Sequence, residues 1–222
     1  MYPRPPIRAS TVYWILGLNC FSLIKMEKYV LGLELPTDPR WTGNAEKNIH
    51  EILVDHAWCE QKAASSCISL IIQYPEREKL VATLTPVVAE EWSHFERVLL
   101  ELRKRGLPLL PPRKDEYVEQ LQKAVRKGGN REQQLTEKLL LNALIEARSC
   151  ERFRLLWKEL RDPMLQVFYY ELMVSEASHY KMFISLAKEY ADPKGVVSRW
   201  SEWLKLETGI IKNLVVRGDR MH

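Results

Sequence analysis

Apolar side chains recur every three or four residues along most of this chain, and this spacing places them on one face of an α-helix. The stretch EKLLLNALIEARSCERFRLLWKEL, residues 137–160, shows the pattern and is rich in residues that favour helices. Glycine, which weakens helices, occurs only 9 times in 222 residues. The hydrophobic pattern therefore predicts an all-α fold with a substantial core.

Capping and breaking residues divide the apolar pattern into helices. One helix is predicted from the N-cap residue Asn44 to the boundary at Tyr74–Pro75, and the next has Pro86 near its beginning and stops at Gly106. The later helices are predicted from about Asp115 to Lys127, which precedes Gly128 and Gly129, from about Arg131 to Leu160, from Asp162–Pro163 and from Asp192–Pro193. Between the second and third lies a stiff connector, LPLLPP, residues 107–112.

This order of elements predicts an irregular segment over residues 1–43 and one helical domain over residues 44–222. Four long helices form the core of the domain. The short helix belongs to the crossover between the two halves, and the last helix is a C-terminal extension.

The stretch from Thr11 to Ile24 is apolar and follows Arg4 and Arg8, as in a signal peptide. It lacks a clear cleavage site with small residues, and it is too short to span a bilayer. We interpret it either as a non-native start ahead of Met26 or as a short packing segment. Because no other segment approaches a transmembrane helix, we expect a cytoplasmic protein without membrane contact.

One motif occurs twice among the polar positions of the long helices. A lone glutamate precedes a Glu-x-x-His motif by 31 residues in the first copy and by 30 residues in the second. The residues are Glu60, Glu91 and His94 in the first copy, and Glu146, Glu176 and His179 in the second. A helix, a turn and a returning helix need about this length, since fifteen helical residues rise only about 22 Å. Each copy therefore predicts one helical hairpin.

The spacing within the motif is suited to metal binding. Residues three apart on a helix share a face, so the Glu and the His of each motif can reach the same ion. Two such hairpins, packed antiparallel, place four carboxylates and two imidazoles in one bundle core, which is the ligand set of ferritin-like di-iron and di-manganese proteins. Apolar residues flank both motifs, so the carboxylates need a cation or a charged partner. The alternative to a metal site is a network of buried ion pairs.

The four cysteines, Cys20, Cys59, Cys67 and Cys150, form no Cys-x-x-Cys pair. Three of them fall in predicted helices, where free cysteine behaves as a small buried hydrophobic residue. We interpret them as reduced core thiols rather than as metal ligands, because six harder ligands are already at hand.

Positive charge is concentrated between the two motifs. Residues 101–131 contain nine basic and four acidic side chains, an excess of +5, whereas the whole chain has a net charge of +4. Such a segment suits contact with a phosphate backbone, and the candidate RNA-binding residues are Arg103, Lys104, Arg105, Arg113 and Lys114. The alternative is an ordinary solvated surface that is rich in lysine and arginine.

Four strings around the motif residues carry a resemblance to a known family. They are DHAWCEQKAASS around Glu60, EEWSHFERVLLELRKRG around His94, ALIEARSCERF around Glu146 and SEASHYKMF around Glu176. Together they resemble the tRNA-(2-methylthio-N6-isopentenyladenosine) hydroxylases, the MiaE family, over about residues 51–206. The first forty or so residues show no such match.

The resemblance implies a non-haem di-iron monooxygenase that inserts one oxygen atom from O2 into the isopentenyl group of a modified adenosine. It implies two iron ions, O2 as co-substrate, the anticodon loop of tRNA as partner, and an electron-donor protein or reductase that the sequence does not identify. The same six residues are implied as ligands, with no catalytic residue beyond them. We expect Glu91 and Glu176 to bridge the two ions, and Glu60 and Glu146 to bind one ion each.

Two rival functions remain at this point. A ferritin-like ferroxidase, or another di-iron oxidase without an RNA substrate, would use the same ligands, and a purely structural helical bundle would bind no metal.

Further residues are expected to assist the metal ligands. A metal-bound histidine needs an acceptor on its other nitrogen, and Glu90, Asp55 and Asn142 are candidates. We predict that four basic residues line the mouth of a substrate pocket: Lys62, Arg97, Arg148 and Arg152. The alternative for each of them is an i,i+4 ion pair on a solvated helix face.

Overall fold

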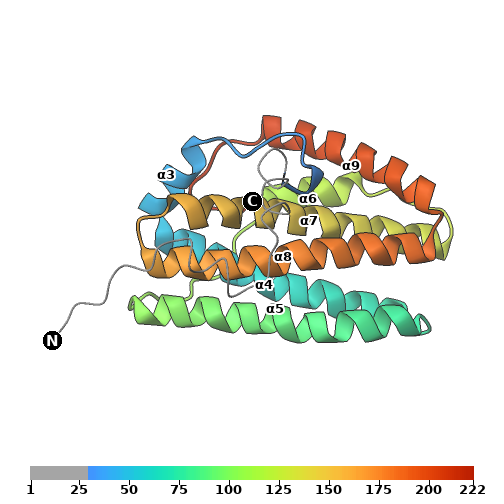
Figure 1. Ribbon diagram of the computed structural model, residues 1–222, viewed down its shortest axis with the longest axis horizontal. Helices are drawn as coiled ribbons and strands as arrows, with labels where there is room; N and C mark the ends of the chain where they lie inside the picture. Colours follow the sequence, from blue (N-terminus) through green and yellow to red (C-terminus); the bar gives the residue numbers. More distant parts are fainter. Residues whose placement is uncertain (1–29) are drawn as a thin grey trace, which may run out of the picture.

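The computed structural model describes residues 30–222, which are mostly helical (Figure 1). A short 3-10 helix, η1 (Val30–Gly32), is followed by α3 (Arg40–Lys47), α4 (Ile49–Gln73), α5 (Glu78–Lys104), α6 (Glu116–Ala124), α7 (Arg131–Glu159), α8 (Pro163–Tyr190) and α9 (Pro193–Asn213). Residues 30–222 contain no β-strand. The all-α prediction is confirmed.

The four longest helices form two hairpins that lie side by side along the long axis of the molecule (Figure 1). Helix α4 packs against α5, and α7 packs against α8. The short helix α6 lies in the crossover between the hairpins, and α9 covers α6 and α7 from outside. This is the predicted ferritin-like four-helix bundle with a crossover helix and a C-terminal extension.

Side-chain caps fix the starts of the later helices, as the sequence predicted. Asp115 accepts a hydrogen bond from the backbone N–H of Val118, and Asp162 and Asp192 cap α8 and α9 in the same way. Asn130 and Gln133 form a reciprocal capping box at the start of α7. Helix α6 is shorter than predicted, since it ends at Ala124 rather than at Lys127.

Two predicted helix starts are wrong. Asn44 lies inside α3, which begins at Arg40, and α4 begins at Ile49 after a break at Asn48. The earlier start has a local cause, because the backbone N–H of Arg40 donates to Asp38 Oδ1 at 2.8 Å and Trp41 is buried against the bundle. Helix α5 begins at Glu78, so Pro86 lies well inside it. The expected boundary between residues 43 and 44 therefore falls within a helix, and the division into two parts stays a prediction.

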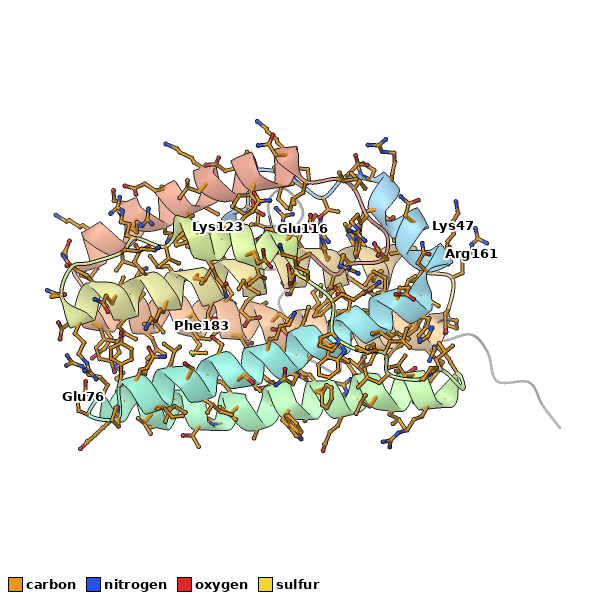
Figure 2. All side chains as sticks on the ribbon, turned by 180° about the vertical axis from the view of Figure 1, so that it is seen from behind. Lys47, Glu76, Glu116, Lys123, Arg161 and Phe183 are labelled. Atoms are coloured by element: carbon orange, nitrogen blue, oxygen red, sulfur yellow. The ribbon has the colours of Figure 1, made fainter. Side chains whose placement is uncertain are left out.

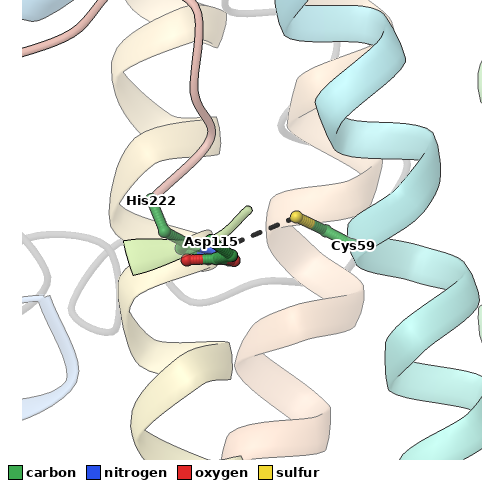
Figure 3. Close-up of side chains that lie close together, drawn as sticks. All are labelled: Cys59, Asp115 and His222. Atoms are coloured by element: carbon green, nitrogen blue, oxygen red, sulfur yellow. Dashed lines mark hydrogen bonds and ion pairs between the residues drawn. The ribbon is translucent and has the colours of Figure 1, made fainter. Parts of the chain in front are cut away.

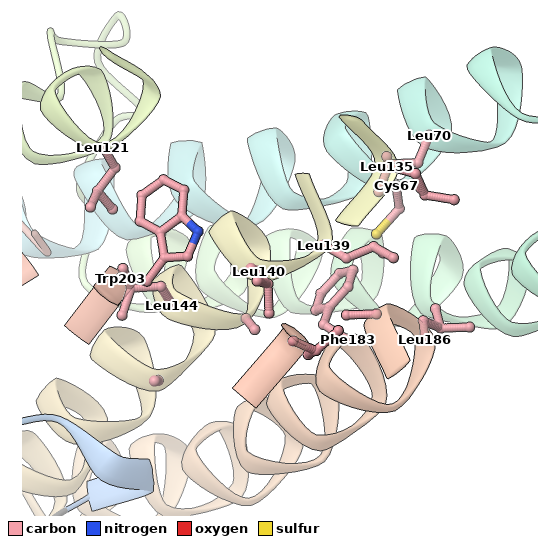
Figure 4. Packing of buried hydrophobic residues seen from close by; sticks show 14 of the residues in the cluster. Cys67, Leu70, Leu121, Leu135, Leu139, Leu140, Leu144, Phe183, Leu186 and Trp203 are labelled. Atoms are coloured by element: carbon pink, nitrogen blue, oxygen red, sulfur yellow. The ribbon is translucent and has the colours of Figure 1, made fainter. Parts of the chain in front are cut away.

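One apolar cluster fills the end of the bundle that α6 and α9 cover. Leu121 from α6, Leu144 from α7 and Trp203 from α9 meet there, and Phe183 of α8 packs nearby (Figure 4). Phe183 lies inside the bundle, while charged side chains such as Glu76 and Arg161 lie on its outer surface (Figure 2). Burial of this kind contributes about 25 cal/mol for each Å² of apolar surface removed from water.

A second apolar cluster, which includes Ile52, Phe95, Phe153 and Leu165, fills the other end. On α4, α5 and α8, buried polar residues lie between the residues of the two clusters. On α4, for example, Ala57 belongs to the second cluster, Cys67 to the first, and Glu60 lies between them. The bundle therefore has a buried polar layer near its middle.

None of the helices within residues 30–222 has the length and apolar character needed to cross a membrane. The apolar stretch from Thr11 to Ile24 lies outside the described residues, as does Cys20.

Candidate metal centre

All six predicted ligand residues lie in the buried polar layer, with exposed fractions between 1% and 6%. All four long helices contribute to the set: α4 and α7 contribute one residue each, and α5 and α8 contribute two each. In chain order these are Glu60, Glu91, His94, Glu146, Glu176 and His179. The bundle thus brings together side chains that are up to 119 residues apart in the sequence.

The six side chains form two overlapping groups of potential metal ligands. Glu60, Glu91, His94 and Glu176 have ligand atoms within 4.8 Å of one another, and so do Glu91, Glu146, Glu176 and His179. Glu91 and Glu176 belong to both groups. A carboxylate that belongs to two adjacent ion sites has the position of a bridging ligand.

The spacing around His94 fits a common ion rather than hydrogen bonds. Its Nδ1 atom lies 3.5 Å from an oxygen of Glu60, of Glu91 and of Glu176. These separations are long for hydrogen bonds, but ligand atoms held at about 2.1 Å from one ion are themselves about 3.0–3.5 Å apart. The geometry of the donor atoms therefore fits a cation.

Buried oxygen atoms without hydrogen bonds support the same conclusion. Within residues 30–222, both carboxylate oxygens of Glu91 and Oε1 of Glu176 are buried and have no hydrogen-bond partner. Glu91 Oε1 lies 2.7 Å from Nδ1 of His179, but not in a hydrogen-bonding geometry. Buried polar atoms are nearly always paired, so these oxygens are available to a metal ion.

The charges of the six side chains do not balance. Burial raises the pKa of Glu146 well above its usual value, and the carboxylates of Glu176 and Glu91 raise it further. Burial lowers the pKa of His94, but the carboxylates of Glu60 and Glu91 outweigh this effect and raise it to about 10. Even with Glu146 neutral and both imidazoles protonated, the other three carboxylates leave one negative charge in excess. Cations neutralise such an excess, whereas an ion-pair network of these six groups does not.

Side chains outside the set of six predicted ligands orient two of those ligands, His179 and Glu60. Glu90 Oε2 lies 3.1 Å from Nε2 of His179, and the hydroxyl of Ser175 donates to Glu90 Oε1 at 2.6 Å. Glu90 therefore holds the ring of His179 with Nδ1 toward the polar layer.

His56, which the sequence analysis missed, is fully buried, and its Nε2 atom lies 2.6 Å from Oε1 of Glu60. The i,i+4 spacing of the two residues on α4 was a signal that could have found it.

The other two candidates for this orienting role contact different groups. Asp55 Oδ2 accepts a hydrogen bond from the backbone N–H of Met221 at 2.7 Å. Asn142 Oδ1 accepts one from the hydroxyl of Ser66 at 2.9 Å. Their predicted contacts with metal-binding histidines are wrong, because the tail after α9 and helix α4 take up these acceptors.

The cysteines within residues 30–222 are free thiols. Cys67 and Cys150 are buried, as expected, and Cys59 is half-buried.

The basic residues expected at a pocket mouth have different environments. Lys62 is exposed, and Arg97 forms an exposed ion pair with Glu171 at 2.5 Å. Arg148 is fully buried and bonds to Glu207 and Glu151, so the prediction that it lines an open mouth is wrong, as is the alternative of a solvated face. Arg152 is also buried, with its guanidinium over the ring of Trp41.

Carboxylates neutralise most of the predicted RNA-binding segment. Lys104 and Arg105 both pair with Glu101, and Arg105 also pairs with Asp162. Arg113 pairs with Glu51 and Asp219, and Lys114 pairs with Glu119. Arg103 is exposed and has no ion-pair partner within the described part of the chain. The count of charges along the sequence therefore overstates the free positive charge of this segment.

The fold and the two overlapping groups define a class of protein, because a four-helix bundle with two Glu-x-x-His helices and two further glutamates is the arrangement of ferritin-like dimetal-carboxylate proteins. Within that class the chain belongs to the MiaE family. The family model described as tRNA-(MS[2]IO[6]A)-hydroxylase (MiaE) matches residues 24–222.

Two relatives are named as tRNA 2-(methylsulfanyl)-N(6)-isopentenyladenosine(37) hydroxylase. The one from Pseudomonas putida KT2440 is 39% identical over 160 residues, which cover 72% of this chain and 77% of the relative. The one from Salmonella typhimurium LT2 is 28% identical over 206 aligned residues, covering 71% of this chain and 75% of the relative. The suspected family is thus confirmed, and the ferroxidase alternative is not favoured.

A solved structure has the same fold. It is Protein 43 with aldehyde deformylating oxygenase activity from Synechococcus, with a TM-score of 0.81 and 33% sequence identity. The match covers 86% of this chain and 94% of that protein. The neighbour is itself an oxygenase, which agrees with a bundle built around oxygen chemistry.

Proposed function

We propose that this protein is an O2-dependent hydroxylase of the isopentenyl group of 2-methylthio-N6-isopentenyladenosine in tRNA. The observation that carries the proposal is the pair of overlapping Glu and His groups in a chain that belongs to the MiaE family. The names of the two relatives support the tRNA substrate. The activity of the structural neighbour supports an oxygenase.

The ligands proposed for two iron ions follow from membership of the two groups. Glu60 and His94 belong to one group only, Glu146 and His179 to the other, and Glu91 and Glu176 to both. Carboxylates and neutral imidazoles suit iron. When bound, two iron ions would supply the electrons that reduce O2 and the oxidant that hydroxylates the substrate.

The protein's own residues prepare this layer for the reaction. Glu90 and His56 fix the orientations of His179 and Glu60, so that the ligands need little rearrangement. The two apolar clusters lie on either side of the layer and keep bulk water away from it. The described residues supply no separate acid or base in this layer beyond the ligands and their hydrogen-bond partners.

The partners implied are tRNA, which presents the modified base in its single-stranded anticodon loop, and an electron-donor protein or reductase. The exposed Arg103 is the proposed first phosphate contact of the basic segment. A tRNA substrate makes the cytoplasm the proposed compartment.

Labelled oxygen gas tests the reaction. The reduced, iron-loaded protein is supplied with oxygen-18 gas and with isopentenylated tRNA, and the nucleosides are analysed by mass spectrometry. We expect a hydroxyl group that carries the label, and no product from tRNA that lacks the isopentenyl group. An unlabelled hydroxyl would point to water as the oxygen source. Untouched tRNA together with turnover of free ferrous iron, or of an aldehyde, would overturn the proposed substrate.

A further inference from the structure

The chain after α9 returns to the bundle and is held there by several hydrogen bonds. Met221 is buried, its N–H donates to Asp55 Oδ2 at 2.7 Å, and its carbonyl accepts from Arg152 at 2.6 Å. The indole N–H of Trp41 donates to the carbonyl of Arg220 at 3.2 Å. This tail, residues 214–222, is thereby packed against α3, α4 and α7.

At the end of the tail, three potential metal ligands meet from three distant parts of the chain (Figure 3). Cys59 lies on α4, Asp115 directly precedes α6, and His222 belongs to the tail. Their ligand atoms are all within 4.8 Å of one another. None of the three belongs to the two groups in the polar layer.

The separations match those of ligands around a tetrahedral ion. His222 Nδ1 is 3.8 Å from Cys59 Sγ and 3.5 Å from Asp115 Oδ2. With a metal–sulfur distance of 2.3 Å and metal–nitrogen and metal–oxygen distances near 2.1 Å, the corresponding edges are about 3.6 Å and about 3.4 Å. By contrast, 3.5 Å is long for a direct hydrogen bond between an imidazole and a carboxylate.

The surrounding residues hold these atoms in position. Ser149 Oγ lies 3.0 Å from Nε2 of His222, and Tyr117 stacks on the ring with centroids 5.3 Å apart. These contacts occupy one nitrogen and direct the other, Nδ1, toward the cluster. Asp115 uses Oδ1 to cap α6, so Oδ2 is available. An outer partner on the second nitrogen is typical of metal-binding histidines.

The same geometry argues against a nucleophilic triad. In a triad, the histidine uses one nitrogen for the nucleophile and the other for the carboxylate that orients it. Here Cys59 and Asp115 both face Nδ1 of His222, and a serine hydroxyl faces Nε2. The arrangement is that of donors around one point.

We propose that Cys59, Asp115 and His222 form a metal site separate from the six-residue centre, and that it binds a borderline divalent cation such as Zn²⁺. A thiolate and a carboxylate match the charge of the cation, and this mixed sulfur, nitrogen and oxygen set suits zinc. Bound metal would tie the tail and the start of α6 to α4. For Cys59 this replaces the interpretation as a plain core thiol, and it does not depend on the proposed hydroxylase function.

Titration of the full chain with Co²⁺ tests the site, because cobalt bound to a thiolate shows a charge-transfer absorption that oxygen and nitrogen ligands do not give. We expect this absorption in the wild type. Cys59→Ser should abolish it, and His222→Ala should weaken cobalt binding at this site by at least about 10-fold. Cys67→Ser and Cys150→Ser are the matched controls, and they should keep the absorption.

Two outcomes would overturn the proposal: cobalt that binds to the wild type without the charge-transfer absorption, and an absorption that persists in Cys59→Ser. Misfolding could also abolish the absorption, and His222→Ala tests for this because residue 222 lies outside every helix and its replacement should leave the bundle folded. Circular dichroism checks the helical content of each variant. Ligands of the six-residue centre include no thiolate, so loss of that centre alone leaves the absorption intact.

Discussion

Glu91 is almost fully buried, and neither of its carboxylate oxygens has a hydrogen-bond partner within residues 30–222. Such a group is costly unless a cation balances it. Glu176, like Glu91, belongs to both groups of potential ligands. Glu91, whose two carboxylate oxygens both lack a hydrogen-bond partner, is therefore one of the two residues that two metal ions would share.

Glu91→Gln is expected to lose most of the bound iron, because a shared ligand serves both ions. The wild type should hold about two ions per chain after reconstitution with ferrous iron. Glu96→Gln, an exposed glutamate on the same helix, is the matched control and should retain both. Metal analysis of the three proteins decides the matter, and full iron content in Glu91→Gln would contradict the shared-ligand assignment.

Glu90→Ala is expected to weaken metal binding without removing a ligand. Glu90 contacts Nε2 of His179, and loss of such an outer partner typically costs 10–100-fold, so we expect about that loss in metal affinity. Glu90→Gln retains an oxygen acceptor and should recover part of the affinity. Equal affinities in the wild type and Glu90→Ala would mean that the contact does not position the ring.

At the scale of elements, α9 is attached to the bundle by buried charge as well as by apolar packing. Arg148 of α7 donates to Glu207 of α9 at 2.5 Å, and both side chains are fully buried. Tyr117 of α6 donates to the same carboxylate at 3.4 Å. One carboxylate therefore connects the crossover helix, a core helix and the C-terminal extension.

Glu207→Ala is expected to destabilise the protein by about 3–5 kcal/mol, since it leaves the buried charge of Arg148 with an incomplete set of partners. Glu202→Ala on the same helix removes the ion pairs of an exposed carboxylate with Arg126 and Arg199, and it should cost much less than Glu207→Ala because water screens that carboxylate. Denaturant unfolding at constant metal concentration measures both. Similar losses for the two variants would show that the Arg148–Glu207 pair contributes no more than a surface pair.

At the scale of the whole molecule, the positive charge of residues 101–131 is distributed unevenly between paired and free side chains. Arg105 is held between Glu101 and Asp162, while Arg103 is exposed without an ion-pair partner in the described residues. Only free cations gain fully from contact with phosphate. The surface most suited to tRNA is therefore smaller than the sequence suggests.

Arg103→Ala is expected to weaken tRNA binding at low salt and to reduce the slope of log affinity against log salt by about one. Arg105→Ala is the matched control, because its main effect should be on stability through the lost pairs with Glu101 and Asp162. Binding is measured at several salt concentrations, with iron content as a check on folding. An unchanged slope in Arg103→Ala would move the docking face elsewhere, with Lys212, Arg217 and Arg220 next to be tested.

The sequence by itself determined the fold class, most helix ends and the six residues of the candidate metal centre. These features depend on local rules: a helical face repeats every three to four residues, caps act within one turn, and a hairpin returns after about thirty residues. Two copies of one motif at nearly equal spacing therefore predicted Glu60, Glu91, His94, Glu146, Glu176 and His179 before any contact was known.

Only the tertiary structure decided which side chains share a site or a charge. That Arg148 is buried against Glu207, and that His222 meets Cys59 and Asp115, are consequences of docking. The residues that meet in these two clusters lie 56 or more positions apart in the sequence, and neither helical periodicity nor a count of charges shows which distant segments pack together.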